Sequence, residues 1–115
     1  MNKTSFKEDL TYVLANTDFA DYKNMEFPVS ISKEFGERPI DDLFLETRSS
    51  NVLKRNKVHS MKDLTENWDR IHKMKNCGVT SIKEIKNHFM QVWYESLTAD
   101  ERVEFWEEFI EANRI

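Results

Sequence analysis

Residues that interrupt regular structure are scarce in this chain. Its 115 residues include only two glycines and two prolines, the residues that most often end helices or open turns. Apolar side chains instead recur at helical spacing, as at Ile82, Ile85 and Phe89, which fall on one face of a helix. Residues 27–31 favour extended backbone, but a lone strand cannot make a sheet. The sequence therefore predicts an all-α fold.

Helical periodicity and capping residues predict six helices. Thr47 is a suitable N-terminal cap for the second helix, and Thr98 with Glu101 forms a capping box before the last. Asn76, Cys77 and Gly78 are expected to form a turn before the fifth helix, with Gly78 free to adopt a left-handed conformation. The expected helices cover residues 5–15, 48–56, 61–66, 68–74, 80–94 and 99–113.

The formal net charge of −4 is unevenly distributed. Residues 1–38 carry five Lys/Arg and seven Asp/Glu, residues 39–97 carry ten and eight, and residues 98–115 carry two and six. The middle segment is thus the basic one. Its cations suit the phosphates of a nucleic acid, although a run of charge is also typical of a solvated surface. These cations include Lys54, Arg55, Lys57, Lys73, Lys75, Lys83 and Lys86.

Several classes of function find no support in the sequence. Cys77 is the only cysteine, so an internal disulfide is excluded. The three histidines show no metal-ligand spacing, and no glycine-rich nucleotide loop or nucleophile motif is present. No apolar run is long enough to cross a bilayer, and the first residues lack a signal-peptide pattern. We therefore expect a cytoplasmic protein without catalytic residues, metal or cofactor.

Two short motifs carry groups that suit a phosphate or a base edge. Arg48 and Asn51 lie three residues apart, so on a helix they share one face. Gly78 precedes Thr80 and Ser81 at a helix start, where unpaired N–H groups and the positive end of the helix dipole favour a phosphate. Both motifs therefore point to a polyanionic partner.

Each motif also has a purely structural interpretation. Arg48 can pair on the surface with an acidic neighbour, of which Asp41, Asp42 and Glu46 are the candidates. Gly78 can be a turn glycine that closes the preceding helix. These alternatives stay open at the level of single residues.

The two motifs belong to a longer pattern. It reads PIDDLFLETRSSNVLKRNKVHSMKDL, then a spacer with Trp68 and Ile71, then MKNCGVTSIKEIKNHF. In order and spacing this segment, residues 39–97, resembles the C-terminal domain of the bacterial RNA polymerase alpha subunit. The resemblance implies a compact helical bundle with helix-hairpin-helix character.

The resemblance also implies a DNA-contacting surface. Arg48 would enter the minor groove of double-stranded DNA, where readout mainly separates A·T from G·C pairs. Asn51, Gly78 and Ser81 would hold backbone phosphates, and Glu84 would orient Arg48 or a bound water. We therefore expect these residues to bind A·T-rich DNA.

Three features depart from the family pattern. Thr80 lies on the expected DNA surface, at a position where the family commonly has a basic residue. Phe44 stands where the family often has an acidic residue that contacts neighbouring transcription factors, while Asp42 beside it keeps the acidic character. Asp42 and Phe44 are therefore the candidate partner-binding residues. The family helix usually ends in a glycine-containing turn, whereas residues 91–94 continue here without a breaker.

The two ends lie outside the resemblance. We divide the chain into an N-terminal extension (residues 1–38), the DNA-binding core (39–97) and an acidic amphipathic C-terminal helix (98–115). Val103, Trp106 and Ile110 line one stripe of that last helix. This stripe can pack on its own domain, or it can dock on a partner or on a second copy in a homodimer. Alternatively, the carboxylates on the rest of the helix can compete with DNA for the basic surface.

The sequence supports two main hypotheses of function. The first is a small non-catalytic bacterial protein that binds double-stranded DNA in a transcriptional role and is associated with the nucleoid. The second is a protein-interaction module that contacts RNA polymerase, sigma-like proteins or other transcription factors with little or no DNA binding. A third class, a nuclease or repair accessory, has less support because no catalytic domain accompanies the helices.

Overall fold

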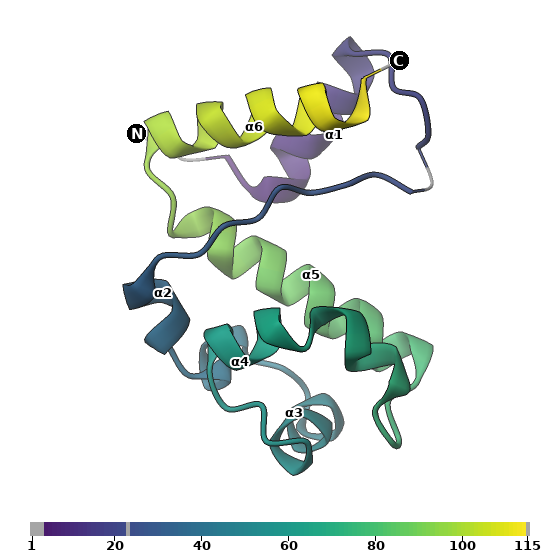
Figure 1. Cartoon of the computed structure of the whole chain (residues 1–115), viewed down its shortest axis with the longest axis vertical. Coiled ribbons are helices and arrows are strands. Elements are labelled where there is room, and N and C mark those ends of the chain that lie inside the picture. Colours follow the sequence, from purple (N-terminus) through teal and green to yellow (C-terminus); the bar gives the residue numbers. More distant parts are fainter. Residues whose placement is uncertain (1–3, 23, 115) are drawn as a thin grey trace. The chain divides into compact units, whose positions relative to one another are not determined.

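The computed structural model describes residues 4–22 and 24–114 (Figure 1). All regular structure in this part of the molecule is helical, and its only β features are two isolated bridges. The all-α prediction is therefore confirmed. From the N-terminus onward the elements are α1 (Phe6–Asn16), α2 (Lys33–Glu37), the 3₁₀ helix η1 (Ile40–Leu43), α3 (Thr47–Arg55), α4 (Met61–Glu66), the 3₁₀ helix η2 (Trp68–Lys73), α5 (Val79–Glu95) and α6 (Ala99–Asn113).

Five of the six predicted helices are α-helices that begin and end within one residue of the expected bounds, and the sixth is η2. The short helices α2 and η1 were not predicted. Gly36 is a poor helix former, yet it lies inside α2 because α2 packs on α4. A side chain at Gly36 would place its Cβ 3.4 Å from Cβ of Lys62, so the glycine allows the two helices to approach closely.

The chain divides into two compact units, which we describe separately. The central unit is Ile31–Trp93, and the terminal unit combines Met1–Ser30 with Tyr94–Ile115. The central unit carries twelve Lys/Arg and nine Asp/Glu, a formal charge of +3. The terminal unit carries five and twelve, a formal charge of −7. The two units thus have net charges of opposite sign.

Every helix of the central unit contributes side chains to its core. Phe89 of α5 lies near the middle, with its ring centroid 5.0 Å from Trp68 and 6.0 Å from Phe35. Two backbone hydrogen bonds join the start of η1 to the start of α4. They run from Ile40 N to His59 O and from Met61 N to Arg38 O. The buried core residues of this unit include Phe35, Ile40, Leu43, Val52, Leu53, Val58, Met61, Leu64, Ile71, Ile85 and Phe89.

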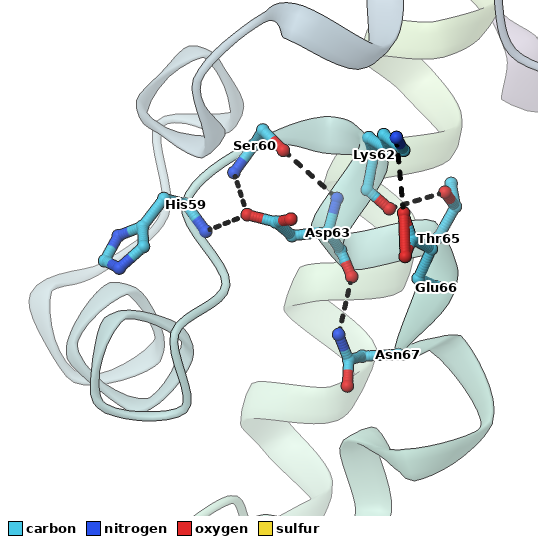
Figure 2. Close-up of polar contacts among 7 residues, drawn as sticks. All are labelled: His59, Ser60, Lys62, Asp63, Thr65, Glu66 and Asn67. Atoms are coloured by element: carbon cyan, nitrogen blue, oxygen red, sulfur yellow. Dashed lines mark hydrogen bonds and ion pairs between the residues drawn. The ribbon is translucent and has the colours of Figure 1, made fainter.

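Helix α4 begins with a complete capping box (Figure 2). The Ser60 hydroxyl accepts from Asp63 N at 3.1 Å, and the Asp63 carboxylate accepts from Ser60 N at 3.2 Å and His59 N at 3.0 Å. The His59 hydrogen bond is the main reason that the pKa of Asp63 lies below its ordinary value. At the other end, the Asn67 amide donates to Asp63 O. These bonds fix a six-residue helix that would be too short to form alone.

An aromatic cluster forms the interior of the terminal unit. Phe6 of α1 stacks on Trp106 of α6 at 5.8 Å and meets Tyr94 edge-on at 5.5 Å. The Asn113 side-chain amide joins the end of α6 to the backbone of Glu26. It accepts a hydrogen bond from Glu26 N at 2.8 Å and donates one to Glu26 O at 2.7 Å. The segment around residue 26 has no regular structure, so a single side chain provides the hydrogen bonds that a strand partner would give.

Candidate nucleic-acid interface

Glu84 joins the two sequence motifs within the central unit. Its carboxylate accepts a hydrogen bond from Glu46 N at 2.9 Å and a short hydrogen bond from the Ser49 hydroxyl. Glu46 and Ser49 flank Arg48 in the first turn of α3, whereas Glu84 lies in the second turn of α5. The hydrogen bonds therefore bring the starts of α3 and α5 together.

The N-terminal cap of α3 differs from the prediction. Glu46, not Thr47, is the capping residue, and it makes no side-chain capping bond. The reason is a contact from α5. In a capping box, the side chain of the third helical residue accepts a hydrogen bond from the N–H of the capping residue, and here the Glu84 carboxylate accepts that bond from Glu46 N. Ser49 occupies that third position and donates to the same carboxylate. Sequence analysis missed Ser49, since only its place in the first helical turn would have drawn attention to it.

Glu84 was expected to orient Arg48 or a bound water, and the structure adds two intramolecular partners for its carboxylate. Both carboxylate oxygens are occupied by Ser49 and Glu46. Partial burial raises the pKa of Glu84, but the hydrogen bonds from Ser49 and Glu46 N, with the charge of His88, bring it below its ordinary value of 4.5. Glu84 is therefore a carboxylate that positions α3.

His88 lies one helical turn beyond Glu84 and has its own fixed partner. Its Nδ1 is 2.7 Å from Leu43 O. Because a carbonyl oxygen can only accept, this geometry places a proton on Nδ1. The bond anchors α5 to the end of η1, next to Phe44.

Arg48 and Asn51 are both exposed on α3, three residues apart as predicted. Two of the three acidic neighbours that might have neutralised Arg48 have other partners, since Asp42 pairs with Arg38 at 2.8 Å and Asp41 with Lys54 at 2.9 Å. No ion pair among residues 4–22 and 24–114 involves Arg48. Its charge is therefore available to a partner.

The turn before α5 differs from the prediction in one detail. Asn76, with φ of 66°, takes the left-handed conformation, and Gly78 has no positive φ. Asparagine tolerates the left-handed region better than most residues, which explains why Asn76 can adopt the conformation that was expected for Gly78. Gly78 instead lies directly before α5, where its carbonyl accepts from Ile82 N at 3.0 Å. A Cβ at Gly78 would meet no heavy atom within 4 Å, so this helix start is open.

The first turn of α5 offers backbone groups more than side chains. Thr80 is exposed, whereas Ser81 is buried, with only 6% of its surface accessible. The first backbone bond at this end runs from Ile82 N to Gly78 O. The N–H groups of Val79, Thr80 and Ser81 come before it and have no acceptor within the helix, as at any helix start. An anion at this end would meet those N–H groups and the positive end of the dipole.

Most of the cations that the sequence analysis named in the central unit are not neutralised. Lys54 pairs with Asp41, and Lys86 lies 5.3 Å from the Trp68 ring. The others take part in no ion pair among the residues that the structure describes. They include Arg48, Arg55, Lys57, Lys73, Lys75 and Lys83.

The candidate partner-binding residues behave differently from each other. The Asp42 carboxylate is held by Arg38. Phe44 is 86% exposed and has φ of 51°, in the left-handed region that bulky residues rarely adopt.

Within residues 4–22 and 24–114, no cluster of three potential metal ligands occurs and no helix is long and apolar enough to cross a membrane.

The fold and these contacts define a small all-helical domain in which two helix starts meet within a unit of net positive charge. Comparison with known proteins identifies the family. The family model for the C-terminal domain of the bacterial RNA polymerase alpha subunit matches residues 30–91, and the protein belongs to that family. The family is transcription-related and of the DNA-binding type, and the domain that defines it is non-catalytic.

A curated relative agrees with this family. The DNA-directed RNA polymerase subunit alpha of Malacoplasma penetrans (strain HF-2) is 37% identical over 81 residues, which cover 70% of this chain and 24% of the relative. The chain thus spans about a quarter of that protein's length. No solved structure matches the chain.

Proposed function

We propose that the central unit binds double-stranded DNA without chemistry, and that Arg48 enters the minor groove. The observation that carries this proposal is the Glu84 bridge, which joins α5 to the first turn of α3, the turn that carries the exposed Arg48. Asn51 lies on the same face of α3 and would contact a phosphate. The match to the C-terminal domain of the polymerase alpha subunit supports the same surface.

The phosphates would be held chiefly by backbone groups at the start of α5. Gly78 leaves room for a phosphate to approach, and Thr80 adds an exposed hydroxyl. Ser81 would contribute its N–H, because its side chain is buried. The acidic terminal unit does not supply this surface, so the overall charge of −4 is compatible with a local polyanion site.

Minor-groove readout separates mainly A·T from G·C pairs, so we expect a preference for A·T-rich DNA with little finer specificity. Such binding would place the protein on the nucleoid. One small module makes few phosphate contacts, and its affinity alone should be weak.

The test is fluorescence anisotropy with an A·T-rich and a G·C-rich duplex at two salt concentrations. Arg48→Ala should weaken binding by about 1 to 3 kcal/mol and reduce the A·T preference. Arg70→Ala is the matched control, because Arg70 is an exposed arginine of the same unit outside both motifs. Equal affinity of wild type and Arg48→Ala would refute the role of Arg48.

A second candidate function is a protein-interaction module that contacts RNA polymerase or transcription factors. The observation that favours it is Phe44, a large exposed apolar side chain at a position that the resemblance assigns to partner contacts. If neither duplex binds at low salt while purified RNA polymerase does, this second function is correct. A DNA complex whose affinity falls as salt rises would favour the first.

A further inference from the structure

The terminal unit carries an open groove between α1 and α6. Its volume is about 510 Å³, and Val13, Trp106 and Ile110 contribute apolar surface to it. Two of its lining residues project far into solvent: Tyr12 of α1 is 70% exposed and Val103 of α6 is 58% exposed. Exposed apolar side chains that flank a groove are a recurring feature of binding surfaces.

The groove has a floor built from polar side chains. The Tyr94 hydroxyl donates a short hydrogen bond to Asp9 and accepts one from Trp106 Nε1 at 2.7 Å. The Arg102 guanidinium lies 4.1 Å from the centroid of the Tyr94 ring, and its Nη1 donates to Thr4 O at 2.9 Å. The network is incomplete, because the buried Nε and Nη2 of Arg102 have no hydrogen-bond partner among the residues that the structure describes.

The charge around the groove selects a basic occupant. Asp9 and Glu107 are among its lining residues, and the terminal unit has a formal charge of −7. Arg102 also lines the groove, and its buried cation offsets part of the charge of these two carboxylates. Apolar surface in a unit of strong negative charge suits a partner that presents an apolar side chain and carries net positive charge.

The central unit has a formal charge of +3 and presents such an apolar side chain. Of its exposed large apolar residues, Phe44 and Val79, Phe44 is the larger and the more exposed, at 86%. Its left-handed backbone, with φ of 51°, is unfavourable for an aromatic residue. The adjacent carboxylates of Asp41 and Asp42 are paired with Lys54 and Arg38, which leaves the surroundings of Phe44 without free negative charge from those two residues.

We propose that Phe44 of one molecule inserts into the α1–α6 groove of a second copy of this chain. The +3 central unit of one copy would then face the −7 terminal unit of the next. Because the two surfaces differ, the contact is heterologous, and a single such contact leaves one Phe44 and one groove unused. Copies would therefore join head to tail. This contact does not depend on DNA binding, but it would raise the avidity of a weak module on a long duplex.

The test is sedimentation velocity without DNA, at protein concentrations up to about 1 mM, which reaches weak association. The wild type should sediment faster as its concentration rises, and less so at high salt. Phe44→Asn removes the ring but keeps a residue that tolerates left-handed backbone, and Val103→Lys places a cation at the groove. Each variant alone should stay monomeric. Circular dichroism should show the same helical content as the wild type, since both sites are exposed.

An equimolar mixture of the two variants gives the decisive result. Phe44→Asn retains an intact groove and Val103→Lys retains Phe44, so the mixture should form a 1:1 heterodimer and nothing larger. Val79→Thr and Glu104→Gln are matched controls, and both should associate like the wild type. A monomeric wild type at all concentrations would overturn the proposal. Association by either single variant, absence of the heterodimer, or loss of association in a control would do the same.

Discussion

Glu84 of α5 accepts a hydrogen bond from the backbone N–H of Glu46, 38 residues earlier in the sequence, at 2.9 Å. A helix usually satisfies its first N–H groups with side chains of its own first turn. Helix α3 instead uses a carboxylate from another helix, which makes the position of Arg48 depend on α5. A residue assigned to DNA contact by resemblance is thus, in this structure, a structural residue of the same surface.

The Glu84 bridge should contribute to stability. Glu84→Ala leaves Glu46 N and the part-buried Ser49 hydroxyl without their acceptor, so the free energy of unfolding should fall by about 1 to 3 kcal/mol. Urea denaturation measures this change. Asn87→Ala is the matched control, because Asn87 is exposed on the same helix, and its effect should be within about 0.5 kcal/mol.

The same bridge should weaken in acid. The pKa of Glu84 lies below its ordinary value of 4.5, because the hydrogen bonds from Ser49 and Glu46 N and the charge of His88 outweigh the effect of burial. A depressed folded-state pKa contributes stability above pH 4.5, and this is lost as the pH falls through the folded pKa. The stability gap between wild type and Glu84→Gln should therefore shrink between neutral pH and about pH 3. A gap that stays constant over that range would contradict the assignment.

Local patterns predicted the long helices well. The capping box at Thr98 and Glu101 is present, and α6 covers the predicted residues 99–113. Ile85 and Phe89 are buried on the apolar face that their spacing indicated. These signals lie within a few residues of one another, so they can be read from one segment alone.

Features that depend on distant residues could not be predicted in this way. The cap of α3 comes from Glu84, and α2 keeps Gly36 because α4 packs against it. Two acidic neighbours of Arg48, Asp41 and Asp42, pair with Lys54 and Arg38 instead. The sequence could name the candidate residues, but tertiary contacts decide which of them remain free.

Tyr94 should make the protein sensitive to alkali. Burial, followed by the hydrogen bond to Asp9, raises the pKa of Tyr94 from 10.0 to about 12. A raised folded-state pKa contributes stability that is present below pH 10 and is lost as the pH rises towards about 12. Tyr94→Phe should be less stable than the wild type at neutral pH, and the difference should decrease across that window. Thermal unfolding of both proteins from neutral to strongly alkaline pH provides the measurement.

Asn113 should hold the irregular segment of the terminal unit in place. Its amide bonds both Glu26 N and Glu26 O and also donates to Phe109 O at 2.8 Å. In Asn113→Ala, the amide proton of Glu26 should exchange with solvent much faster, and the unfolding free energy should fall by about 1 to 3 kcal/mol. Asn16→Ala is the control, since that amide bonds only one exposed carbonyl, Tyr12 O. Unchanged exchange at Glu26 would show that other contacts fix the segment.

Thr80 gives the DNA proposal a test by gain of affinity. It is exposed in the first turn of α5, at a position where the resemblance led us to expect a basic residue. If a phosphate lies at this helix start, Thr80→Lys should bind a duplex more tightly and steepen the salt dependence by about 0.9 in the logarithmic slope, as for one further neutralised phosphate.

The matched control for that variant is Thr11→Lys. Thr11 is also an exposed helical threonine, but it belongs to the terminal unit, so the substitution makes the same change of net charge elsewhere. Long-range attraction would improve binding in both variants alike, because it depends on total charge. A direct phosphate contact requires the lysine at residue 80 alone to change the salt slope. Equal slopes in the two variants would place the phosphates away from the start of α5.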